Sequence, residues 1–148
     1  DRHRPMISGI KVLEEFQKTK FDIDVIFVDR YHGSEAHFSF SRLYLNNESW
    51  FYMNSRDTSD VLLTQADMTF IRRVSIEGKL ISFSCPTPSS YDHFYLILFA
   101  KNGNIEGLKS NVDLNLVKLP DDDEASESLR VFKRLEEIIV SVAKDLNK

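Results

Sequence analysis

The segment HFYLILFA, residues 93–100, constrains the fold most strongly because it is apolar at almost every position. Successive side chains of a strand point to opposite sides of a sheet, so a strand of this kind must be covered on both faces. Asn102-Gly103 follows it, and both residues tolerate the positive φ of a two-residue hairpin turn. We therefore predict a central strand at 93–100 that turns into a neighbouring strand.

Short apolar runs separated by turn residues indicate further strands. FDIDVIFV, residues 21–28, alternates apolar residues with Asp22 and Asp24, which is the period of a half-buried strand. Glu77-Gly78 separates two apolar runs that we interpret as a hairpin. The other expected strands are 36–45, 50–53, 68–76, 79–85, 104–108 and 112–119.

Two segments have the spacing of an amphipathic helix. After a polar lead-in, residues 6–20 carry apolar side chains at helical spacing, with Ser8 as the predicted N-cap. Near the C-terminus, one apolar stripe with steps of three or four residues predicts a helix at 127–147. The stripe consists of Leu129, Phe132, Leu135, Ile139, Val142 and Leu146. We expect it to cover the central strand, which leaves the apolar residues Val131 and Ile138 available for a homodimer.

Antiparallel strands followed by one amphipathic helix resemble the element order of the pleckstrin-homology-like superfold over residues 21–147. That resemblance implies a seven-stranded sandwich or barrel capped by the C-terminal helix, although this chain has no Trp in its last helix. The expected fold class is mostly β with helices (α+β): a lead-in and short helix at 1–20, then a single domain at 21–148. The alternative is an α+β layer with both helices on one face of the sheet.

Composition narrows the class of protein. A net charge of −4 argues against a general nucleic-acid binder, which usually carries a basic patch. The longest apolar run, 94–100, is far shorter than the ~20 residues of a membrane-spanning helix. The only cysteine, Cys85, excludes an internal disulfide and fits a reducing compartment. The chain begins DRHRPM, so we expect a domain of a longer cytoplasmic or nuclear protein.

No motif of the sequence indicates a catalytic residue, a cofactor or a metal. In an extended segment His32 and His37 point to opposite sides, which disfavours a metal site with Glu35. Cys85 is expected to be a small buried residue rather than a nucleophile activated by His93. The motif Arg-Arg-Val-Ser, residues 72–75, matches the substrate site of a protein kinase that selects basic residues. The predicted strand would hide this site from a kinase.

Large side chains at 50–53 are the expected binding feature, because a short strand cannot bury four of them. Either Trp50 and Tyr52 or Phe51 and Met53 should reach the outer face and contact a protein partner, together with Arg42 and Arg72. A second expected surface docks a basic partner on Asp121, Asp122, Asp123 and Glu124. The predicted function is therefore a non-catalytic protein-interaction domain. The alternative is a module that binds a lipid or a small apolar ligand.

Overall fold

The computed structural model describes residues 20–31, 39–54, 57–84, 93–111 and 122–147. The predicted helix before Lys20 and the predicted strand at 112–119 lie outside these residues. The same holds for Cys85 and for the metal candidates His32, Glu35 and His37.

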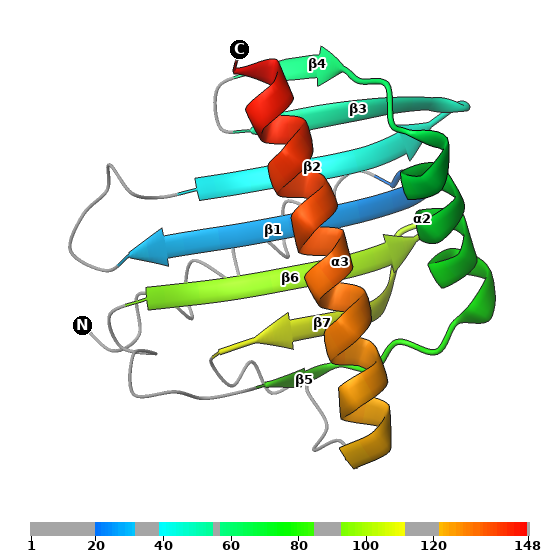
Figure 1. Cartoon of the computed structure of the whole chain (residues 1–148), viewed down its shortest axis with the longest axis vertical. Coiled ribbons are helices and arrows are strands. Elements are labelled where there is room, and N and C mark those ends of the chain that lie inside the picture. Colours follow the sequence, from blue (N-terminus) through cyan, green and yellow to red (C-terminus); the bar gives the residue numbers. More distant parts are fainter. Residues whose placement is uncertain (1–19, 32–38, 55–56, 85–92, 112–121, 148) are drawn as a thin grey trace.

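The described residues form one seven-stranded sheet in the order β4-β3-β2-β1-β6-β7-β5 (Figure 1). Its strands are β1 (Ile23–Tyr31), β2 (Ser39–Asn46), β3 (Ser49–Asn54), β4 (Thr58–Asp60), β5 (Phe83–Ser84), β6 (His93–Lys101) and β7 (Asn104–Ser110). All neighbouring strands are antiparallel except β5, which pairs parallel to β7. The sheet is open, with β4 and β5 at its edges, so the expected closed barrel is wrong.

The centre of the sheet confirms the prediction for residues 93–100. β6 lies between β1 and β7, and its residues from Leu96 to Ala100 are completely buried. The turn to β7 has φ of 53° at Asn102 and 83° at Gly103, as the hairpin requires. β1 differs from the half-buried strand that we predicted, because Asp24, Ile26 and Val28 are buried as well as the residues facing the helices.

Residues 68–76 were predicted as a strand, and this prediction is wrong: they belong to helix α2 (Gln65–Glu77). Thr64 caps the N-terminus, where its Oγ1 accepts a hydrogen bond of 3.1 Å from the backbone N–H of Asp67. Gly78 ends the helix in the left-handed conformation (φ 59°). Glu77-Gly78 is thus a helix end rather than a hairpin. The buried residues Ile71, Val74 and Ser75 have helical spacing.

The C-terminal helix α3 (Asp122–Leu146) starts five residues earlier than the predicted 127 and crosses one face of the sheet (Figure 1). Its buried apolar residues pack on the apolar side chains of β1, β2 and β6, and each contributes roughly 1.5–3 kcal/mol. They are Phe132, Leu135, Ile138, Ile139 and Val142. The predicted stripe is therefore right at its centre, whereas its ends, Leu129 and Leu146, are exposed.

Helix α2 packs on the same apolar cluster as α3, through Ile71 and Val74. The open sheet with two helices on one face is closer to the alternative α+β layer than to a sandwich, although α2 is not one of the two predicted helices. Ile138, an expected homodimer position, is buried in the core of its own chain, and Val131 packs against that core.

Candidate functional site

The structure separates the four large residues of β3 between the two faces of the sheet. Trp50 and Tyr52 are buried in the core under the helices, and Phe51 and Met53 are half-buried on the opposite face. Tyr52 shares a hydrogen bond of 3.0 Å with Ser41, whereas the indole N–H of Trp50 has no hydrogen-bond partner among the described residues. Only Phe51 and Met53 could reach a partner while the core stays closed.

Arg42, which we expected to bind a partner, forms a buried ion pair with Asp24 on the face opposite α3. Arg42 Nε donates to Asp24 Oδ1 at 2.8 Å and Nη2 donates to Oδ2 at 2.7 Å, with both side chains at most 5% exposed. Burial raises the pKa of the Asp24 carboxyl, while the hydrogen bonds and the positive charge of Arg42 oppose this rise. The pair is therefore a structural crosslink between β1 and β2.

Aromatic rings surround this pair on the same face. Phe21 stacks on Tyr44 with 4.0 Å between ring centroids, and Tyr44 stacks on Phe51 at 5.3 Å. The guanidinium carbon of Arg42 lies 4.6 Å from the centroid of the Phe21 ring, a cation–π contact. The role of Asp24 was not predicted; its signal in the sequence is an acid followed at alternate positions by the apolar residues Ile26 and Val28.

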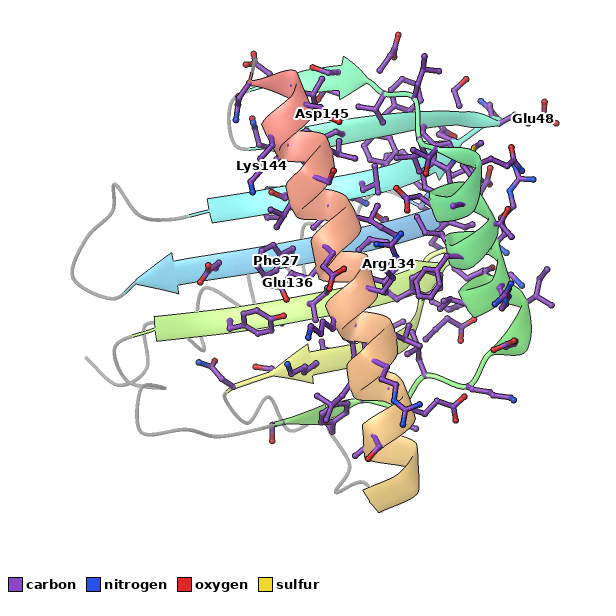
Figure 2. All side chains as sticks on the ribbon, in the orientation of Figure 1. Phe27, Glu48, Arg134, Glu136, Lys144 and Asp145 are labelled. Atoms are coloured by element: carbon purple, nitrogen blue, oxygen red, sulfur yellow. The ribbon has the colours of Figure 1, made fainter. Side chains whose placement is uncertain are left out.

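A second polar group fixes α3 to the sheet. Tyr95 on β6 donates a hydrogen bond of 3.3 Å to Glu136 on α3, and its ring packs edge-on against Phe27. Figure 2 shows Phe27 and Glu136 at the side of α3. Burial is the main cause that raises the pKa of the Tyr95 phenol, and the negative charge of Glu136 raises it further. Because its pKa is raised, the phenol is less suited to acid–base catalysis near neutral pH, which requires a pKa close to the working pH.

The acidic residues before the helix are only partly described. Asp121 and the side chains of Asp122, Asp123 and Glu124 lie outside the described part of the structure, although the backbone from Asp122 onwards is helical. The expected docking of a basic partner on these acids stays a prediction.

The outward side of α2 combines exposed apolar and basic side chains. Ile76 is 80% exposed, and Arg72 and Arg73 are exposed without an ion-pair partner among the described residues. A shallow depression lies between the side chains on this side, which we call the α2 outer surface. It is lined by Gln65, Met68, Thr69, Arg72, Arg73, Ile76 and Glu77.

Asp67, the acidic residue in the first turn of α2, is paired with α3 rather than with these arginines. Asp67 accepts a hydrogen bond of 2.7 Å from Arg134 of α3, which ties the two helices together. Figure 2 shows Arg134 on the side of α3 that faces α2. The α2 outer surface thus keeps two arginines against the single acid Glu77, in a chain whose overall charge is −4.

Within the described ranges, no three His, Cys, Asp or Glu side chains are grouped as metal ligands would be. No helix in those ranges is both long and apolar enough to cross a membrane. Comparison of the chain with protein-family models, with curated proteins and with solved structures finds no match.

Proposed function

We propose that this chain is a non-catalytic protein-interaction domain of a larger intracellular protein, and that it binds an acidic partner segment on the α2 outer surface. The observation that carries the proposal is Ile76, an 80% exposed large apolar residue beside two exposed arginines. Such a combination of an apolar anchor with a charged border is typical of protein interfaces.

The energetics favour a partner that covers both kinds of side chain. Covering Ile76 would contribute up to roughly 1.5–3 kcal/mol, which is the value for complete burial of such a side chain. Arg72 and Arg73 would attract carboxylates and can bind them in bidentate geometry. A partner segment with an apolar residue among Asp and Glu therefore fits the surface.

The proposed partner is acidic, whereas the sequence suggested a basic one, and Arg72 is the predicted binding residue that lies on the α2 outer surface. Trp50, Tyr52 and Arg42 are buried, so their part in binding would require the core to open. The resemblance to the pleckstrin-homology-like superfold likewise stays a proposal based on element order. The chain departs from that order in α2, which stands between β4 and β5.

The test is photo-crosslinking at residue 76 of the whole chain in cell extract. A photoreactive amino acid at position 76 should capture a partner peptide of net negative charge, and the same amino acid at position 140 serves as the matched control. Val140 is also an exposed apolar residue, but it lies on α3. Arg72→Glu with Arg73→Glu should reduce capture at residue 76 at least tenfold in a chain that still melts cooperatively. Equal capture at 76 and 140, or capture unaffected by the charge reversal, would refute the proposal.

The α2 outer surface does not favour the alternative function, binding of a lipid or small apolar ligand, because five of its seven lining residues are polar or charged. A crevice between the end of α2 and the start of α3 is lined by Val74, Leu80 and Val131 together with polar residues. Its cavity is about 20 Å³, which is room for about one water molecule. The alternative therefore stays a prediction from the sequence.

A further inference from the structure

The motif Arg72-Arg73-Val74-Ser75 has a different meaning in α2 from the one it would have in a strand. The helix exposes both arginines, whereas Ser75 lies on the inner side and is 7% exposed. The recognition elements of the motif are thus accessible, and only the acceptor hydroxyl is hidden. A kinase that selects arginine could modify the site if the end of α2 opened.

The C-terminal turn of α2 is held by one buried apolar side chain, that of Val74, and by few hydrogen bonds. Residues 76–79 are all exposed, and a Cβ placed on Gly78 would have no neighbour within 4 Å. The cap consists of one backbone hydrogen bond, from Gly78 N–H to the Val74 carbonyl, at 3.3 Å. The carbonyl of Ser75 accepts one further, long hydrogen bond of 3.4 Å from Lys101 Nζ. Opening this turn exposes Val74, but a helix end with a single apolar anchor opens at a lower free-energy cost than the whole domain.

Opening this turn does not require the rest of α2 to unfold. The first half of the helix is held by the Thr64 cap, by the ion pair between Asp67 and Arg134, and by the buried side chain of Ile71. All three lie before Arg72. Unwinding from Arg72 onwards would therefore present an extended Arg-Arg-x-Ser segment while the domain stays folded.

We infer that Ser75 is a cryptic phosphorylation site, modified by an arginine-selective protein kinase during local opening of the C-terminal turn of α2. In the transfer, Ser75 Oγ forms a bond to the γ-phosphorus of ATP, and the bond from that phosphorus to the β–γ bridging oxygen breaks. ADP leaves with the electron pair, and the hydroxyl proton passes to the catalytic aspartate of the kinase.

Phosphorylation would keep the turn open. A phosphate of nearly two negative charges would lie at the C-terminal end of α2, where the helix dipole disfavours negative charge. It would also have to enter the buried position that the Ser75 hydroxyl occupies. A further effect, neutralisation of Arg72 and Arg73, would weaken binding of an acidic partner, and only this effect depends on the proposed function.

The test needs no partner. The folded chain and a peptide of residues 70–79 are incubated with an arginine-selective kinase and MgATP, and phosphate is located by mass spectrometry. We expect phosphate on Ser75 of both, more slowly in the folded chain, and none on the exposed Ser126 and Ser141, which lack preceding arginines. Arg72→Ala with Arg73→Ala should slow the modification at least tenfold in both.

Gly78→Ala tests the opening step. Its left-handed conformation disfavours alanine, so the turn should open more often and Ser75 of the folded chain should react about 5- to 30-fold faster. Hydrogen exchange should show that phosphate speeds exchange at residues 72–78 and leaves β1 and β6 unchanged. The inference is overturned if the peptide is not modified, if the folded chain and its Gly78→Ala variant both stay unmodified, or if exchange increases throughout the sheet.

Discussion

The buried ion pair between Asp24 and Arg42 leads to a specific prediction about stability. Both side chains are at most 5% exposed and joined by two short hydrogen bonds. Removing one partner leaves a charge buried without its counter-charge, which typically costs about 3–5 kcal/mol. We therefore expect Asp24→Asn and Arg42→Met each to lower the free energy of unfolding by about that amount.

The double variant Asp24→Leu with Arg42→Met should be far less destabilised than the sum of the single changes Asp24→Leu and Arg42→Met, which complete the double-mutant cycle. Apolar replacement of a buried pair is often neutral, because the desolvation cost of both charges disappears with their attraction. The double variant also loses the cation–π contact with Phe21, which lowers its free energy of unfolding by about 0.5–2 kcal/mol. Two single costs of about 3 kcal/mol or more, against a double-variant cost of up to about 2 kcal/mol, give an expected coupling energy of at least about 4 kcal/mol. Urea unfolding at neutral pH measures all of these variants.

The two single variants should differ in their dependence on pH. In Arg42→Met, burial raises the pKa of Asp24 without the opposing guanidinium. A carboxyl whose folded pKa is raised stabilises the fold fully below its unfolded pKa, near 4, and this contribution is lost as pH rises. The defect of Arg42→Met should therefore shrink between about pH 7 and about pH 5, whereas that of Asp24→Asn should not, because a guanidinium keeps its proton.

The matched control is the ion pair between Arg134 and Asp67, which has the same 2.7 Å contact but a 44% exposed arginine side chain. Arg134→Met should cost no more than about 1 kcal/mol. If Asp24→Asn and Arg42→Met cost as little as this control and their effects are additive, then the pair is not desolvated and the reasoning is wrong.

Three further predictions concern the core and the helix–sheet contact. Gly107→Ala should lower the free energy of unfolding by about 1–3 kcal/mol, because the new Cβ would lie 2.6 Å from Leu80 Cβ and 3.2 Å from Phe132 Cζ. An unchanged midpoint of urea unfolding would contradict this packing. Above about pH 10 the unfolded chain loses the Tyr95 proton while the folded chain keeps it, so stability should fall with rising pH. Tyr95→Phe should show less of this fall, as followed by alkaline denaturation. Deletion of residues 128–148 should abolish cooperative unfolding, since it removes the five buried apolar side chains of α3; a cooperative melt of the truncated chain would show that α3 is dispensable.

Local sequence predicted the elements whose patterns admit only one solution. A strand that is apolar on both faces belongs at the centre of a sheet, and Asn102-Gly103 supplies the turn after it. The C-terminal stripe was found because its period fits a helix and no strand. Its ends were misjudged, since Leu129 and Leu146 are 38% and 41% exposed, and only tertiary packing shows which part of the stripe is buried.

Residues 68–76 show where local pattern fails. Phe70, Val74 and Ile76 with Arg72 between them alternate as in a strand, while Ile71 and Val74 have the spacing of a helix. Thr64 and Gly78 were signals for the helix, since one is a good N-cap and the other a good C-terminal cap. As a helix, α2 places Arg72 and Ile76 on the surface and Ser75 inside. Both the proposed binding surface and the cryptic serine depend on this placement.

The sequence by itself determined the central strand, the hairpin after it and the amphipathic C-terminal helix, because local period and turn chemistry are sufficient for each of these. Tertiary structure decided that the sheet stays open, that α2 is a helix, and that Asp24 meets Arg42. Each of these depends on which segments become neighbours. A charge or an apolar residue acquires its role from the partner it packs against, and that partner lies far away in the chain.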